Sequence, residues 1–426
     1  MLLTPLDLRG RLQELDEVLP APGDAGEDVR DVVAGIIDLV RRDGDAALRA
    51  LTEKLDGVVV DELAVPLADR AAALAAVPAD LRAALEVAYD HICAYHAMEG
   101  TPPGDFVADG VRVRHLLRPV DRAGCYAPGG RARYPSTVLM CAAPAAVAGV
   151  GKVALCVPPG PDGRIDEATL AAAAVARVDE VYRVGGAQAI AAMAYGTESI
   201  PRVDVVVGPG NRYVAEAKRQ VSGAVGVASA FAGPSEVVVV AGPETPPELA
   251  AIDLVVQAEH GPDGLAWLLS WSEDTVREVS AAVERIVAAS PRRAELEATF
   301  SSGGYACLVD GPEAAVTVAN KVAPEHLELL VDGAEDLLPL VTAAGAVFCG
   351  LWSPASLGDY VAGPNHVLPT NRTARFASAL RADDFRRHIH AVSASKEAIA
   401  VLGPHVVTLA TAEGLPAHAE SIRVRS

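Results

Sequence analysis

The pattern that decides the fold is clearest in the stretch Val203-Asp-Val-Val-Val-Gly-Pro-Gly-Asn-Arg-Tyr-Val-Ala-Glu-Ala-Lys-Arg-Gln-Val221. Its apolar beginning, Val203–Val207, is typical of a buried strand, a glycine turn follows, and Arg212–Val221 is expected to form a helix. The same order occurs twice upstream, after the strand-like runs Val153–Val157 and Val181–Val184. Repeated strand, loop and helix units predict right-handed crossovers and a parallel sheet.

Outside this region the sequence changes character. Residues 29–96 show the apolar spacing of helices, and Val237–Ala241 begins a second series of strands and helices that ends near Ala379. We therefore expect an α/β fold of two doubly wound, Rossmann-like domains with parallel sheets, a short N-terminal arm and a small helical C-terminal segment. The expected bounds are 1–24 for the arm, 25–128 with 236–380 for the larger domain, 129–235 for the second domain and 381–426 for the C-terminal segment.

Composition and charge exclude several classes of function. The chain carries 36 Lys and Arg against 56 Asp and Glu, a net charge of −20, which repels nucleic-acid phosphates and anionic lipid. Its 6 cysteines form no C-x-x-C pair, so we expect reduced thiols rather than disulfides or structural zinc. No signal peptide is evident, and the apolar region 138–151 is too short to span a bilayer. A soluble, cytoplasmic protein is expected.

Three glycine-containing loops are candidates for binding a dinucleotide. Gly149-Val-Gly-Lys-Val-Ala154 fits the G-x-G-x-x-A pattern but precedes a strand, whereas a dinucleotide loop must follow one, so we reject it. The better candidates are Tyr126-Ala-Pro-Gly-Gly130, Gly185-Gly-Ala-Gln188 and Gly208-Pro-Gly-Asn211. The last two open helices, whose N–H groups could meet phosphate, although such turns also occur without a cofactor.

Residues 353–370 predict a shaped loop, because Pro and Gly are too frequent there for a helix or a central strand. The loop holds Asp359 and His366, and loops on a rigid scaffold often carry binding groups. The alternative interpretation is a solvated surface loop.

Three further polar groups stand out in the apolar chain. At about 100° per residue, Gln257 and His260 share one face of an expected helix, whereas Glu259 points away from both. Glu325 and His326 begin an apolar strand, where adjacent side chains diverge and would take separate roles.

Glu413 and His418 flank a break between C-terminal helices. Each pair alone is most simply a surface or core feature. Together with Asp359 and His366 they would fit one site for a divalent metal with oxygen and nitrogen ligands, such as zinc or manganese.

The motifs resemble those of histidinol dehydrogenases, in order from about residue 20 to the C-terminus. The stretches that carry the resemblance are Gly124-Cys-Tyr-Ala-Pro-Gly-Gly130, Tyr134-Pro-Ser-Thr137, Val184-Gly-Gly-Ala-Gln-Ala-Ile190, Gly208-Pro-Gly-Asn211, Ala232-Gly-Pro-Ser-Glu236, Gln257-Ala-Glu-His260, Ala323-Pro-Glu-His-Leu-Glu328 and Gly358-Asp-Tyr-Val-Ala-Gly-Pro-Asn-His-Val-Leu-Pro-Thr370. The family oxidises L-histidinol through L-histidinal to L-histidine, the last steps of histidine biosynthesis, and reduces two NAD⁺ at a site with one zinc in an intertwined homodimer.

The resemblance implies a role for each matching residue. It implies zinc ligation by Gln257, His260, Asp359 and His418, and acid–base catalysis by Glu325 and His326. It further implies that Ser235, His366 and Glu413 join the ligands and His326 around the substrate, and that Tyr126, Gln188 and Asn211 contact NAD. Most of the zinc site would then lie in the larger domain and the NAD contacts in the second domain.

The sequence departs from the family pattern at Ala228, Ala355 and Arg372, none of which is an implied ligand or base. The principal alternative is a dehydrogenase of the same fold that acts on another polar alcohol, such as a sulfonate diol. A zinc hydrolase, with Glu325 activating a metal-bound water, and a metal-binding scaffold without catalysis are the alternatives from other classes.

Overall fold

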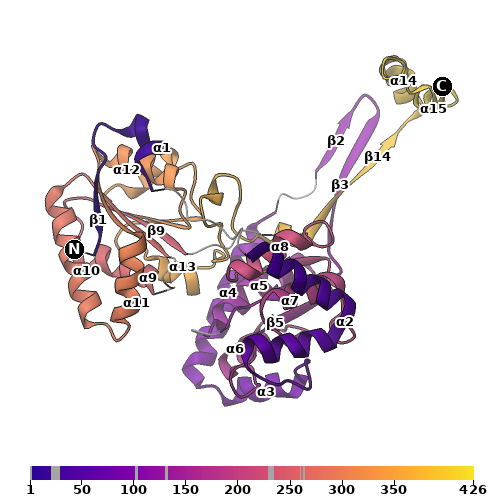
Figure 1. The fold of residues 1–426 in the computed structure, drawn as a ribbon. Coiled ribbons are helices and arrows are strands. Elements are labelled where there is room, and N and C mark those ends of the chain that lie inside the picture. Colours follow the sequence, from indigo (N-terminus) through magenta and orange to yellow (C-terminus); the bar gives the residue numbers. More distant parts are fainter. Residues whose placement is uncertain are drawn as a thin grey trace.

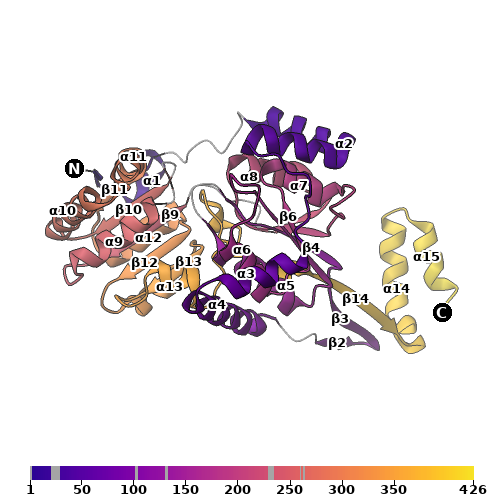
Figure 2. The same cartoon turned by 90° about the horizontal axis from the view of Figure 1, so that it is seen from below.

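The computed structural model describes residues 2–20, 29–100, 104–129, 133–228, 235–259, 261 and 264–426. These residues form two bodies built on parallel sheets and a third, antiparallel sheet that extends away from them as an arm (Figures 1 and 2). The expected α/β fold with two parallel sheets is therefore confirmed.

The first body is a six-stranded parallel sheet of order β1-β11-β10-β9-β12-β13. Its strands are β1 (Thr4–Asp7), β9 (Glu236–Ala241), β10 (Leu265–Ser270), β11 (Gly304–Leu308), β12 (His326–Leu330) and β13 (Ala346–Cys349). Val237 and Val239 pack on one face and Val238 and Val240 on the other, so both faces are covered and the strand reads as a continuous apolar run.

Helices cover both faces of this sheet. One face is covered by α9 (Pro247–Ala258), α10 (Glu273–Ala289) and α11 (Arg293–Gly303). The other is covered by α12 (Pro312–Val322), with the short helices η1 (Leu12–Glu14), α1 (Leu15–Val18) and η3 (Ala334–Leu340).

The second body is a five-stranded parallel sheet of order β6-β5-β4-β7-β8. Its strands are β4 (Arg122–Tyr126), β5 (Lys152–Val157), β6 (Glu180–Arg183), β7 (Val205–Val207) and β8 (Gly226–Val227). One face is covered by α3 (Leu67–Ala76), α4 (Ala79–Met98), α5 (Pro135–Ala148) and α6 (Glu167–Val175). The other is covered by α2 (Arg30–Asp56), α7 (Gly186–Tyr195) and α8 (Arg212–Val221).

The packing corrects the expected domain bounds in two places. Helices α2 to α4 and strand β4 belong to the body of the five-stranded sheet, so these elements do not join 236–380 as we expected. Strand β1 pairs with β11, so the segment that we expected to be a separate N-terminal arm contributes an edge strand to the six-stranded sheet. Helical periodicity shows that a helix has an apolar face, but it does not show which sheet that face will cover.

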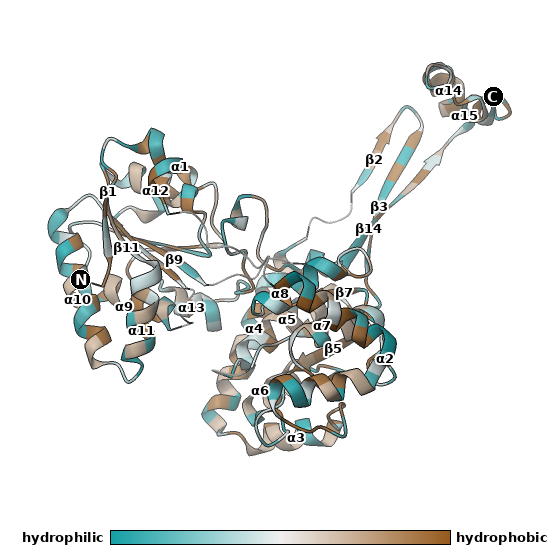
Figure 3. Cartoon of the chain, in the orientation of Figure 1, coloured by the Kyte–Doolittle hydropathy of each residue, from teal (hydrophilic) through white to brown (hydrophobic). Residues whose placement is uncertain are grey.

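The arm is built from β2 (Asp105–Ala108), β3 (Val111–Pro119) and β14 (Arg386–Ala394), followed by helices α14 (Lys396–Ala412) and α15 (Pro416–Arg423). The strand expected at 111–117 is confirmed, but the segment after residue 381 is not wholly helical, because β14 pairs antiparallel with β3 along its length. Figure 3 shows apolar residues alternating with polar ones along this exposed ribbon.

The remaining elements connect the two bodies. They are α13 (Ala355–Tyr360), η4 (Thr373–Arg375) and η5 (Ala382–Phe385). The expected loop 353–370 is irregular apart from α13, and Val367 returns to the core of the five-stranded body. All six cysteines are free thiols, as expected. Within the described part of the chain, no helix has both the length and the apolar character needed to cross a bilayer.

Candidate active site

The strands β9 and β12 are neighbours, and their register places Val237 opposite His326. The residues that precede the two strands therefore lie side by side at the amino end of the six-stranded sheet. This end carries Ser235, Glu236, Glu325 and His326. The amino ends of these strands face the second body, which is a suitable position for a site between the bodies (Figure 2).

Glu325 is 8% exposed and accepts two hydrogen bonds on Oε2. Ser235 Oγ donates at 2.5 Å and the backbone N–H of Glu236 donates at 3.1 Å. The structure thus brings together Ser235 and Glu325, which the family resemblance placed in the same site. Both bonds fix the position of the Glu325 carboxyl group.

His326 is buried and lies between two carboxylates. Its Nε2 lies 3.2 Å from Asp359 Oδ1, and its Nδ1 lies 3.8 Å from Glu325 Oε2, beyond a hydrogen bond. Burial lowers the pKa of His326, but the charges of Glu325 and Asp359 outweigh burial and raise it to about 9. Glu325 and His326 therefore have separate partners, as the sequence suggested.

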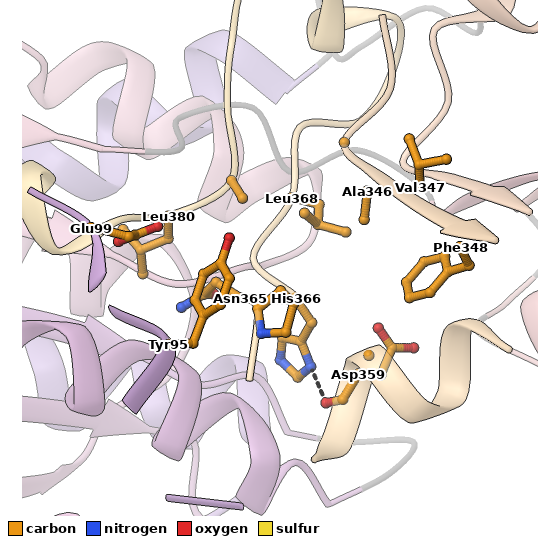
Figure 4. Close-up of a pocket in the computed structure, with 14 residues that line it drawn as sticks. Tyr95, Glu99, Ala346, Val347, Phe348, Asp359, Asn365, His366, Leu368 and Leu380 are labelled. Atoms are coloured by element: carbon orange, nitrogen blue, oxygen red, sulfur yellow. Dashed lines mark hydrogen bonds between the residues drawn. The ribbon is translucent and has the colours of Figure 1, made fainter. Parts of the chain in front are cut away.

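Asp359 lies on α13, and His366 follows in the loop that leads to the second body. His366 Nδ1 donates to the Asp359 carbonyl oxygen at 2.8 Å (Figure 4), which leaves Nε2 to accept from Thr137 Oγ1 at 3.2 Å. Thr137 lies on α5 of the five-stranded body, so His366 contacts both bodies. Its enclosed position lowers the pKa of His366 and favours the neutral ring.

A cavity of about 240 Å³ lies beside these residues, and Figure 4 shows its walls. Its lining comes from α4, from the start of β13 and from the α13 segment that carries Asp359. Its walls include Tyr95, Glu99, Phe348, Asp359, Asn365 and His366. The cavity thus opens beside two of the predicted site residues, at the junction of the two bodies.

The last turn of α9 carries Gln257, which is 4% exposed, whereas Glu259 at the helix end is exposed. This orientation agrees with the expectation that Glu259 points away from Gln257. His260 lies outside the described residues, so the rest of that expectation stays a prediction.

Glu413 and His418 lie on the arm, at the end of α14 and in the first turn of α15, and both are exposed. Figures 1 and 2 show α15 at the tip of the arm, away from both bodies. The chain by itself does not bring these two residues to Asp359. Among the described residues, no group of three or more His, Cys, Asp or Glu side chains is arranged to hold a metal ion.

The residues expected to contact NAD lie at the carboxyl end of the five-stranded sheet, where such ligands bind in doubly wound folds. Tyr126 ends β4, Gln188 lies in the first turn of α7, and Asn211 precedes α8. Tyr126 Oη accepts from Gly186 N–H at 3.1 Å, and Asn211 Oδ1 caps α8 by accepting from Tyr213 and Val214 N–H. These contacts shape the loops, and direct contact with NAD stays a prediction.

Sequence reasoning assigned no role to Glu236 and Glu328, although both are buried beside the site. Burial raises the pKa of Glu236 to about 8, helped by the nearby charge of Glu325. A signal was present: each is an acid within an apolar strand, and acids are almost never fully buried unless they are paired.

Comparison with known proteins agrees with this arrangement. The family model described as histidinol dehydrogenase matches residues 20–426. The histidinol dehydrogenase of Parasynechococcus marenigrum is 46% identical over 402 residues, 94% of this chain and 91% of that protein. That of Gluconobacter oxydans is 44% identical over 419 residues, 98% of this chain and 97% of the relative.

A solved structure shows the same fold over the full length of the chain. The crystal structure of histidinol dehydrogenase from Elizabethkingia anophelis has a TM-score of 0.95 at 34% sequence identity, and it covers 100% of this chain and 98% of the other. The order of the motifs, the fold and the paired Glu325 and His326 at the sheet edge agree with these matches. This chain belongs to the histidinol dehydrogenase family.

Proposed function

We propose that the protein is an NAD-dependent histidinol dehydrogenase that oxidises L-histidinol through L-histidinal to L-histidine, the last steps of histidine biosynthesis, in the cytoplasm. The observation that carries the proposal is the pair of separately held bases, Glu325 on Ser235 and His326 on Asp359, at one sheet edge. Two bases suit two successive oxidations. The relatives named histidinol dehydrogenase support the assignment of L-histidinol as the substrate.

The donor set fits zinc in its chemistry, because Gln257, His260, Asp359 and His418 offer two oxygens and two imidazole nitrogens. Gln257 and Asp359 belong to the six-stranded body, whereas His418 lies on the arm. When bound, zinc would hold the amino and imidazole nitrogens of histidinol and so orient the alcohol.

The first oxidation requires a base for the hydroxyl proton while hydride passes to NAD⁺. His326 is suited to this role because it is buried next to Asp359 and its Nδ1 has no hydrogen-bond partner among the residues that the structure describes. Neutralisation of Asp359 by a bound cation would remove one of the two charges that raise the pKa of His326. The imidazole would then be neutral, and so able to accept a proton, at a lower pH.

The second oxidation requires water to add to the aldehyde before hydride leaves again. Glu325, held by Ser235 Oγ and Glu236 N–H, is suited to take a proton from that water. The hydrated aldehyde then loses hydride to a second NAD⁺ and one proton, which leaves the carboxylate of histidine. His366 and Glu413 complete the substrate contacts in this proposal.

We further propose that two chains form a homodimer with shared sites, in which Glu413 and His418 reach the partner's site. Large apolar side chains are exposed around Asp359, among them Trp352 at 87%, and others are exposed on the arm, such as Leu409 at 64%. Exposed apolar patches of this kind mark protein interfaces.

The experiment that tests the reaction is NADH absorbance with L-histidinol as substrate. We expect about two NADH per histidinol consumed and little free histidinal, because both bases lie at one site. A stoichiometry of one, with histidinal accumulating, would contradict the two-step proposal. Turnover of a sulfonate diol but not of L-histidinol would move the substrate assignment to another polar alcohol.

A further inference from the structure

Glu328 is an acid in the middle of the six-stranded sheet, where a charge is costly. It lies on β12 between β9 and β13, opposite Val239 and Phe348, and is 1% exposed. Residues i and i+2 of a strand point to the same face, so Glu328 lies on the same face as His326. An acid in this position requires hydrogen-bond partners to offset the loss of hydration.

The partners of Glu328 come from two other elements. Its Oε1 accepts from the backbone N–H of Ala355, the first residue of α13, at 3.0 Å. Its Oε2 is buried and meets no N–H or O–H donor within the described part of the chain. Instead, this carboxyl hydrogen-bonds with that of Asp253 on α9, and two carboxyl groups can do so only if they share a proton.

The proton is expected on Glu328. Burial and the hydrogen bond with Asp253 raise the pKa of Glu328, so this group donates and Asp253 accepts. Glu328 thus acts as a neutral acid that accepts on one oxygen and donates on the other. Its bonding capacity matches the two partners that the structure gives it.

The three elements that meet at Glu328 are those that carry the predicted site in the six-stranded body. Gln257 follows Asp253 by one turn on α9, about 40° away around the helix, so both face the same side. His326 precedes Glu328 on the same face of β12. Asp359 follows Ala355 by one turn on the short helix α13.

We propose that Glu328 is a positioning residue, which through Asp253 and the Ala355 N–H joins the elements that carry Gln257, His326 and Asp359 and so fixes the geometry of the metal site. The inference rests on the proposed zinc function. Helix α13 is only six residues long, so its placement depends on contacts outside itself, and the bond from Ala355 to Glu328 supplies one at its start. Residues that orient metal ligands typically change metal affinity by about 10- to 100-fold when removed.

The test measures the zinc dissociation constant of the full-length protein by competition with a chromogenic chelator. Glu328→Leu removes both hydrogen bonds and should weaken zinc binding by about 10- to 100-fold. Glu328→Gln can still accept from Ala355 and donate to Asp253, so its zinc affinity should match that of the wild type. Asp253→Ala removes only the link to α9, at a half-buried helical position, and should weaken zinc binding less than Glu328→Leu.

Thr245→Val is the matched control. Thr245 is also buried, and its Oγ1 donates to Leu330 O at the far end of β12 and accepts from Gly242 N–H. Its loss should lower stability without changing the zinc dissociation constant. A role limited to stability would give Glu328→Leu the same behaviour as this control, with lower stability and unchanged zinc affinity.

The outcomes separate the two proposals. A wild-type protein that binds no zinc would overturn the proposed metal site itself. A wild type that binds zinc, with unchanged affinity in Glu328→Leu and Asp253→Ala, would overturn the positioning role alone. If Glu328→Leu does not fold, the zinc affinities of Asp253→Ala and Asp253→Asn are compared instead. Asn at position 253 can still accept from Glu328, so Asp253→Asn should bind zinc as the wild type does and Asp253→Ala more weakly.

Discussion

At the scale of single residues, the site depends on buried acids whose protonation the fold determines. Glu325 is held by hydrogen bonds from Ser235 Oγ and Glu236 N–H, whereas Glu236 has a raised pKa because it is buried and close to the charge of Glu325. The sequence predicted Glu325, His326 and Asp359 as site residues. It could not predict which acid pairs with which partner, because those pairings depend on the register between β9 and β12.

Glu236 should make stability depend on pH. Its pKa is raised from 4.5 to about 8, so between these values the unfolded chain loses a proton that the folded chain retains. Stability from this group is therefore fully present below pH 4.5 and is lost as pH rises toward 8, by at most about 1.4 kcal/mol per pH unit. In Glu236→Gln that loss disappears, and the amide oxygen can still accept from Asn371 N–H.

The measurement is urea unfolding of the metal-free wild type and of Glu236→Gln at pH 5, 6.5 and 8. The free energy of unfolding of the variant, relative to the wild type, should rise steadily across the series. A difference that stays constant with pH would show that Glu236 is ionised in the folded protein.

Asp359 and Glu259 should respond differently to neutral substitution. Asp359→Ala removes a predicted ligand next to His326 and should lose zinc and activity, whereas the exposed Glu259 should be replaceable by Gln with zinc retained. Metal content after dialysis checks both variants. Loss of zinc from Glu259→Gln but not from Gln257→Ala would reverse the assignment of ligands on α9.

At the scale of elements, local patterns predicted the structure well where strand and helix alternate. Helix α8 begins and ends at Arg212 and Val221, as the sequence indicated. The local pattern fails where partners are distant. It predicts helix for β14, whose identity as a strand depends on pairing with β3, more than 260 residues earlier in the chain. For the short helix α13 the sequence predicts a loop, because Pro and Gly are frequent in residues 353–370.

The loop between β7 and α8 offers a test of the predicted NAD site. Gly208 has φ +109°, and a Cβ there would lie 2.0 Å from the Tyr126 carbonyl oxygen, so Gly208→Ala must displace the loop from β4. We expect a raised KM for NAD⁺ together with unchanged zinc content.

Gly223 is the matched control, since its φ of +100° is similar but a Cβ there meets no atom within 4 Å. Gly223→Ala should cost stability through its backbone conformation, roughly 1 kcal/mol, and leave KM for NAD⁺ unchanged. Equal KM values for NAD⁺ in the two variants would show that the Gly208 loop takes no part in NAD binding.

At the scale of the whole molecule, one chain does not bring the predicted metal ligand His418 to Gln257 and Asp359. Gln257 and Asp359 belong to the six-stranded body, and His418 lies at the tip of the arm (Figure 1). The motifs named these residues, but no sequence pattern shows that β3 and β14 carry the last two helices away from the body. That separation is the structural reason for expecting sites shared between two chains.

Complementation tests the shared site. Asp359→Ala and His418→Ala chains, each inactive alone, should regain about a quarter of wild-type activity when refolded together. Random pairing makes about half of the dimers mixed, and each mixed dimer has one site that combines an intact Asp359 with an intact His418. Mixed dimers that are verified by mass and still inactive would show that His418 serves its own chain.

The pairing of β1 with β11 has a consequence for how the chain is made. Thr4 pairs with Tyr305, so β1 leaves the ribosome about 300 residues before the strand with which it pairs. At roughly 5 to 20 residues per second, this delay is about 15 to 60 s. During that time the strands of the five-stranded sheet, complete at residue 227, have already emerged. Strand β1 is thus translated before the five-stranded sheet but can pair only after that sheet has emerged.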